Sequence, residues 1–186
     1  NSVGWATSLS IQWDAGWVAN GGTTNNTPDT KLMYGYLAGD EKAGPMGNSV
    51  YNTNGTNKPA AYIGNIKAWY QAQGAVGYKV VLYVNGQNYY ETIQGYVESV
   101  SGSPFNNTMV EGSTLMPPLY GQIQSSFSGT FKSITSTTCG SPSGGTGGYM
   151  VFGTLTDDAI LIRIGFAGGH AGLCGFQLVP VFKTSV

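Results

Sequence analysis

The stretch from Gly77 to Val100 constrains the fold more than any other part of the chain. Apolar and aromatic residues alternate along its first half and fall on one side of an extended strand, at Tyr78, Val80, Leu82 and Val84. The dipeptide Asn85-Gly86 follows, and it favours the positive φ angles of a two-residue turn. A second β-rich run completes the pattern, so the stretch predicts a β-hairpin in which Val80 lies opposite Glu91.

Short runs of alternating polarity, separated by turns rich in Gly, Pro and Asn, fill the rest of the chain. The runs are Leu9–Trp13, Lys31–Leu37, Ala61–Gln71, Tyr120–Ile134 with a bend near Gly129, Tyr149–Leu155, Ile160–Phe166 and Phe176–Phe182. None of them keeps the 3.6-residue apolar period of a helix. We therefore predict an all-β fold, a jelly-roll-like antiparallel sandwich of about nine to eleven strands with almost no helix, in one domain over residues 1–186.

Two residues within these runs carry more specific expectations. Trp13 is in phase with Leu9 and Ile11, so the alternation places its ring in the core. Pro180 interrupts the last strand, and because proline has no N–H to donate, it predicts an edge position or a bulge there.

The low charge of the chain limits the partners it can have. Charged residues make up 9% of the sequence, against roughly 25% in an average globular protein, and the net charge is −1. Nucleic acid is therefore not an expected partner. No apolar run is long enough to span a membrane, since Arg163 breaks the stretch Ile160–Ile164. The many aromatic, Ser, Thr and Asn residues are typical of an extracellular β protein.

The rare reactive side chains offer little chemistry. Cys139 and Cys174 are the only cysteines, and in a secreted chain we expect them to form a disulfide; two free buried thiols are the alternative. The single histidine, His170, lies in a glycine-rich turn. Because no GxSxG elbow occurs, we interpret His170 as an exposed turn residue rather than part of a serine triad.

Five segments resemble, in order, a domain common in secreted and surface proteins of planctomycetes and related bacteria, often those with a PEP-CTERM sorting signal. The segments are Asp29–Leu37, Gly77–Val84, Phe127–Phe131, Gly148–Phe152 and Cys174–Val179. The chain departs from that pattern by the long insert Ala38–Pro59 and by lacking the C-terminal anchor. The resemblance implies a secreted β-sandwich that contacts carbohydrate, with no family-wide catalytic residues.

Exposed aromatic side chains are the residues that sugar binding would need, because their flat apolar faces stack on pyranose rings while nearby amides form hydrogen bonds. Trp17 is the most suggestive, since it lies in a Gly- and Asn-rich loop. Trp69 and Tyr70 would point to opposite faces of a strand. The predicted ligand-binding residues are Trp17, Trp69, Tyr70, Tyr89, Tyr90, Asn20, Gln71 and Asn88.

Catalysis of glycoside hydrolysis would require two carboxyl groups that face each other across a groove. The predicted hairpin places Glu91 on the same face as Val80 and Leu82, and its candidate partners are Glu98 and Glu111. Jelly-roll xylanases have a similar size and composition, but their local motifs are not found around these three residues.

Calcium is the one candidate cofactor, as a structural ion at Asp157 and Asp158, or at Asp40 with its neighbour Glu41. Neither pair has the spacing of a calcium-binding motif, so we expect no cofactor for the main function. Exposed edge strands would also allow self-assembly, with a terminal segment such as Asn1–Thr7 or Lys183–Val186 reaching into a neighbour.

Taken together, these patterns predict an extracellular or cell-surface domain that binds a polysaccharide or cell-surface glycan without catalysis. Two alternatives stay open. One is a jelly-roll glycoside hydrolase that uses a pair of glutamates, and the other is a structural subunit of a surface layer or fibre.

Overall fold

The computed structural model describes residues 8–14, 17–20, 27–38, 60–86, 91–102, 110–123, 127, 129–138, 148–167 and 171–184. In these ranges twelve strands form two six-stranded sheets, and two short helices lie between strands along the chain. The helices are α1 (Pro28–Tyr34) and α2 (Ile66–Gln71). The strands are β1 (Ser10–Asp14), β2 (Trp17–Asn20), β3 (Gly35–Ala38), β4 (Ala60–Gly64), β5 (Gly77–Gly86), β6 (Glu91–Ser101), β7 (Val110–Thr114), β8 (Leu119–Ile123), β9 (Lys132–Ile134), β10 (Gly148–Leu155), β11 (Ile160–Ala167) and β12 (Ala171–Val181).

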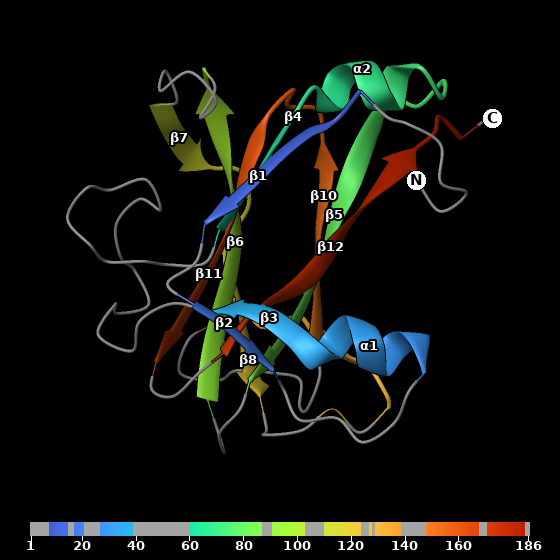
Figure 1. Cartoon of the computed structure of the whole chain (residues 1–186). Helices are drawn as coiled ribbons and strands as arrows, with labels where there is room; N and C mark the ends of the chain where they lie inside the picture. The colour runs from blue at the N-terminus through green and yellow to red at the C-terminus, as the bar shows by residue number, and fades with distance from the viewer. Residues whose placement is uncertain are drawn as a thin grey trace.

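The two sheets pack face to face as the predicted all-β sandwich, which is confirmed (Figure 1). Sheet A has the strand order β1-β4-β11-β6-β7, with β8 also paired to β6, and sheet B has the order β2-β3-β12-β5-β10-β9. The pairing of β9 with β10 is parallel, and the other pairings are antiparallel. Successive strands often change sheet, as β3 to β4, β5 to β6 and β10 to β11 do. Helix α2 lies at one end of the sandwich and α1 at the other.

The predicted hairpin between residues 77 and 100 is wrong, because β5 and β6 belong to different sheets. Val80 pairs with Phe152 of β10 and Leu178 of β12, whereas Glu91 pairs with Ile123 of β8. The predicted facing of Val80 and Glu91 is therefore also wrong.

Tertiary contacts explain why Asn85-Gly86 does not form the turn. Both residues extend β5 and pair with Gly172 and Ala171 of β12. The Asn85 side chain is fully buried, and its Nδ2 donates a hydrogen bond to the carbonyl of Met33 in α1, at 3.0 Å. A local turn preference is worth less than a strand pairing and a buried hydrogen bond.

Helix α1 replaces most of the strand predicted at Lys31–Leu37, and only the last residues form β3. Its start carries helix signals that alternation alone does not reveal. Pro28 occupies the first helical position and Asp29 the first turn, where a negative charge stabilises a helix. The Thr27 carbonyl accepts the first helical hydrogen bond, from Lys31 N at 3.0 Å.

The run predicted as one strand over Ala61–Gln71 is β4 followed by α2. The change occurs at Asn65, which has a left-handed φ of 60° that ends the strand. Asp158 accepts hydrogen bonds from the first two backbone N–H groups of α2. Ile66 N donates to the Asp158 carbonyl at 2.9 Å, and Lys67 N donates to Asp158 Oδ1 at 3.0 Å.

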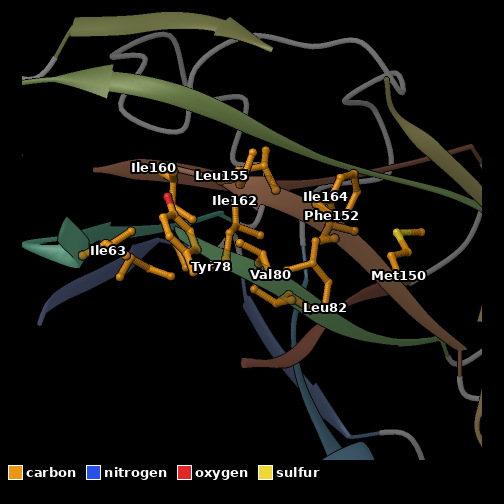
Figure 2. Close-up of a cluster of buried hydrophobic side chains, with 14 of the residues drawn as sticks. Ile63, Tyr78, Val80, Leu82, Met150, Phe152, Leu155, Ile160, Ile162 and Ile164 are labelled. Carbon is orange, nitrogen blue, oxygen red and sulfur yellow. The ribbon is translucent and has the colours of Figure 1, made fainter. Parts of the chain in front are cut away.

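The core lies between the inner faces of the two sheets (Figure 2). The predicted inward face of β5 is confirmed, since Tyr78, Val80, Leu82 and Val84 are all fully buried. Residues of β4, β10 and β11 meet them, among them Ile63, Met150, Phe152, Leu155, Ile160, Ile162 and Ile164. Tyr70 of α2 closes this core at one end, with its ring centroid 5.8 Å from that of Tyr78.

The side chain of Ile134 is almost fully buried and packs between a glycine of each sheet, Gly121 of β8 and Gly148 of β10. A Cβ atom added at Gly121 of β8 would lie 2.5 Å from its Cδ1 atom. A Cβ atom added at Gly148 of β10 would overlap with the same atom. Because real Cβ atoms do not approach so closely, glycine is required on both sides of this isoleucine.

The prediction that Trp13 belongs to the core is wrong, since 62% of its surface is exposed. Ile11 is also exposed, although both point toward the inner side of β1. The alternation gives the correct direction for both side chains, but among the described strands β1 ends sheet A and pairs only with β4. There the two residues border only a small cavity of about 110 Å³, beside Leu173–Phe176 of β12.

Pro180 has the edge position that its chemistry predicts. Strand β3 pairs with β12 only at Gly172 and Leu173, so within the described residues the rest of β12 pairs with β5 alone. The Val181 carbonyl accepts a hydrogen bond from Val76 N at 2.8 Å. Backbone groups alternate along a strand, so those of Pro180 point to the open side.

Candidate functional site

The outer face of sheet B presents aromatic and apolar side chains to solvent. Tyr83 of β5 lies directly opposite Tyr149 of β10, and Val81 lies between Val151 of β10 and Gln177 of β12. All five alternate with core residues and so point outward. We call this surface the tyrosine face; it consists of Val81, Tyr83, Tyr149, Val151, Gln177 and Val179.

Specific contacts hold Tyr83 in place at the centre of this surface. Its hydroxyl donates a hydrogen bond to Gln177 Oε1 at 3.0 Å, from one strand to the next. Its ring packs edge-on against Phe131, with the centroids 5.3 Å apart, and Phe131 in turn packs against buried Phe127 at 4.9 Å. Tyr83 is therefore fixed before any ligand arrives, which lowers the entropy cost of binding.

Burial and neighbouring groups favour the protonated form of the Tyr83 phenol. Partial burial raises its pKa above the usual value, and the negative charge of Asp29 in α1 and the neighbouring Tyr149 raise it further. A neutral phenol at physiological pH can both donate and accept hydrogen bonds.

Exposed valines make the tyrosine face unusual for a solvated sheet. Val151 of β10 is 43% exposed and Val179 of β12 is 40% exposed, and β5 lies between the two strands. Tyr83 and Tyr149 are partly exposed beside them. An apolar surface with rigid rings and one amide group is suited to contact with another molecule.

A second concave surface lies beside the N-terminus of α2. This cavity, which we call the polar pocket, has a volume of about 550 Å³ and is lined by Ser10, Tyr62, Asn65, Val100, Ser101, Gly102, Asp157, Asp158 and Ala159. Gly64 shapes one wall: a Cβ atom there would lie 2.5 Å from the Tyr62 hydroxyl oxygen and 2.8 Å from Ser10 Oγ. The absent side chain leaves room for both hydroxyl groups.

The acidic residues of the polar pocket have roles in the fold. Asp158 holds the N-terminus of α2, and the carbonyl of Asp157 accepts a hydrogen bond from the Tyr78 hydroxyl at 3.0 Å. Among the described residues, no three His, Cys, Asp or Glu side chains come together as a metal site. Asp40, the other calcium candidate, and its neighbour Glu41 lie outside the described residues.

The three glutamates predicted for hydrolysis do not all come together. Glu91 and Glu98 are seven residues apart on β6, or roughly 23 Å along an extended strand, too far for a catalytic pair. Glu98 Oε2 instead forms an ion pair with Arg163 Nε at 2.8 Å, and Arg163 is only 3% exposed. The strand register places Glu111 beside Val100, two residues along from Glu98.

The residues predicted for sugar binding are spread over several regions. Tyr70 is buried in the core, and Trp69 is half-buried against the core. Because both residues belong to helix α2, the prediction that they point to opposite faces of a strand is wrong. Gln71 is exposed on the same helix. Trp17 and Asn20 are the ends of β2, in a strand rather than the predicted loop. Three further candidates lie outside the described residues: Asn88, Tyr89 and Tyr90.

The predicted disulfide has only one partner in the described part of the chain. Cys174 is a free thiol there, beside the cavity bordered by Trp13. Burial raises the pKa of Cys174, so the thiol is neutral at physiological pH. Cys139 and His170 both lie outside the described residues.

The sequence contains a signal for part of the tyrosine face. The alternation of residues 78–84 sends Val81 and Tyr83 outward as surely as it sends Tyr78 and Val80 inward. What alternation cannot show is that Tyr149 is the direct neighbour of Tyr83, since that depends on pairing across 66 residues of chain.

Comparison with protein-family models, with curated protein sequences and with solved structures finds no match. The function must therefore be argued from the chemistry of these surfaces. Neither of the two described helices has the length and apolarity needed to cross a membrane.

Proposed function

We propose that this protein is an extracellular or cell-surface domain that binds a polysaccharide through the tyrosine face, without catalysis. The observation that carries the proposal is the pair Tyr83 and Tyr149, which lie directly opposite each other on the outward face of two interior strands of sheet B. Aromatic rings on a rigid sheet offer flat apolar surfaces to the CH faces of pyranose rings.

Hydrogen-bonding groups around the rings support a sugar as the ligand. The Tyr83 hydroxyl and the Gln177 amide are already bonded to each other, so each has a fixed orientation and further donor or acceptor capacity. Asp29 on α1 adds an acidic group close enough to affect Tyr83. A hydroxyl-rich ligand can use all three groups.

The shape of the surface favours a polymer over a small molecule. The face extends over three adjacent strands, β12, β5 and β10, which at about 4.8 Å spacing span roughly 10 Å. A flat surface buries one side of a chain that runs across it, whereas small ligands usually need an enclosing cleft.

Affinity measurements with two variants test the proposal. Tyr149→Ala should weaken binding to the preferred insoluble or soluble glycan by about tenfold or more, because it removes one of the two rings. Tyr83→Phe should weaken binding less, since it keeps the ring and loses only the hydroxyl. The probes are cellulose, xylan, mannan and chitin in pull-down and affinity electrophoresis.

Trp13→Ala is the matched control, because it removes an exposed ring from the edge of sheet A instead. It should leave binding unchanged. If Trp13→Ala weakens binding and Tyr149→Ala does not, the tyrosine face is not the binding surface. The release of reducing ends from any of these glycans would contradict a non-catalytic role.

A further inference from the structure

The polar pocket has features of a second, independent ligand site. Its volume of about 550 Å³ lies in the range of small-molecule sites. Asn65, at the N-terminus of α2, is among its lining residues, whereas the tyrosine face lies on the outer side of sheet B. Nothing in the proposed polysaccharide binding uses it.

The lining of the pocket is rich in hydrogen-bond acceptors. Three hydroxyl groups line it, from Ser10, Tyr62 and Ser101, together with the side chain of Asn65. The Asn65 Nδ2 group donates to the Ser8 carbonyl at 3.1 Å, which leaves its Oδ1 atom as an acceptor.

Charge in the pocket is unbalanced among its lining residues. Two carboxylates contribute to the wall, and none of the lining side chains is Lys, Arg or His. One oxygen of Asp158 is occupied by the backbone of α2. The hydrogen bond that Asp157 accepts from Tyr78 uses its backbone carbonyl and not its carboxylate, so the carboxylate is the group of Asp157 that a cationic ligand would use.

Apolar groups complete the wall at Val100 and Ala159. They extend a small cluster formed by Tyr62 and Leu161 on the outer side of sheet A. A ligand here meets a hydrophobic surface on one side and acceptors on the others. A bare metal ion would use the acceptors but not the hydrophobic surface.

We infer that the polar pocket binds a small hydroxylated ring that carries a primary ammonium group, which is the chemistry of an amino sugar. The ammonium group donates to Asp157, the ring hydroxyls bond to the serines and Asn65, and one ring face packs on Val100. This site is separate from the tyrosine face and does not depend on it.

Titration calorimetry and ligand-observed NMR with glucosamine at pH 6 test the inference, with N-acetylglucosamine as the uncharged counterpart. Glucosamine should bind at least about tenfold more tightly, because a charge-assisted hydrogen bond is stronger than a neutral one. Asp157→Asn should remove that preference. Asp14→Asn makes the same charge change at the end of β1 and should keep it.

A blocking variant and a metal competitor complete the experiment. Ser101→Tyr, a bulky substitution at an exposed position of the rim, should abolish binding of both sugars. Tyr149→Ala should change neither, which separates this result from that for the polysaccharide. Equal affinity for the two sugars, an unchanged preference in Asp157→Asn, or displacement of glucosamine by calcium chloride would each overturn the inference.

Discussion

The contact of Ile134 with two glycines predicts a specific pattern of compensating substitutions. Gly121→Ala would place a Cβ atom 2.5 Å from Ile134 Cδ1, and the buried isoleucine has little room to move away. Overpacking of this kind costs about 1–3 kcal/mol of folding stability. Ile134→Val deletes Cδ1 itself and alone costs about 0.5–1.5 kcal/mol.

The double variant Gly121→Ala/Ile134→Val should therefore be about as stable as Ile134→Val alone. After the deletion, the nearest atoms to the new Cβ are Cγ1 at 3.0 Å and Cγ2 at 3.2 Å. The coupling free energy between the two sites should then equal the relieved cost of Gly121→Ala, about 1–3 kcal/mol in favour of the pair. Rescue of Gly148→Ala should be less complete, because Cγ1 remains 2.9 Å from that position.

Urea unfolding followed by circular dichroism gives each free energy by linear extrapolation. Gly121→Ala/Ile162→Val is the control, since Ile162 is an equally buried isoleucine that is not among the atoms nearest to Gly121. Its two effects should simply add. If Gly121→Ala and Ile134→Val also add, then Ile134 does not fill the space between the sheets in the way described.

Three further predictions concern single side chains. Asn85→Ala should cost about 1–2 kcal/mol, because it leaves the Met33 carbonyl without its buried donor, and urea unfolding with hydrogen exchange of α1 would measure it. Burial, with the charge of Asp157, raises the pKa of Tyr78 in the folded state, so stability should hold below pH 10, the ordinary tyrosine pKa, and fall above it. That fall should be much smaller in Tyr78→Phe, and an equal fall would refute the assignment. The partly buried thiol of Cys174, whose pKa is raised by burial, should react with a disulfide reagent at pH 8 much faster in urea than in the native protein, and equal rates would contradict this shielding.

The sequence predicted the sandwich because strand alternation is a local property. Tyr78 to Val84 alternate in sequence and are buried in the order expected. The same reasoning could not tell which strands pair, and the expected turn at Asn85 is instead a strand residue held by Met33. Trp13 shows a related limit: its direction was predicted, but its exposure depends on how far the opposite sheet extends.

The candidate sites were harder to predict for the same reason. Tyr83 and Tyr149 become neighbours only through the pairing of β5 with β10. The polar pocket combines residues from β1, the α2 cap, the end of β6 and the loop at Asp157. Aromatic residues can be counted from sequence, but the surface to which each belongs is decided by the sheet order.

Pro180 makes the open side of β12 a poor site for strand pairing with another chain. A strand that paired with the open side of β12 would receive no hydrogen bond from residue 180, because proline has no N–H. Within the described residues β1 is the end strand of sheet A, and Ser10–Asp14 contains no proline. Strand addition is therefore disfavoured along this stretch of β12, whereas no proline opposes it along β1.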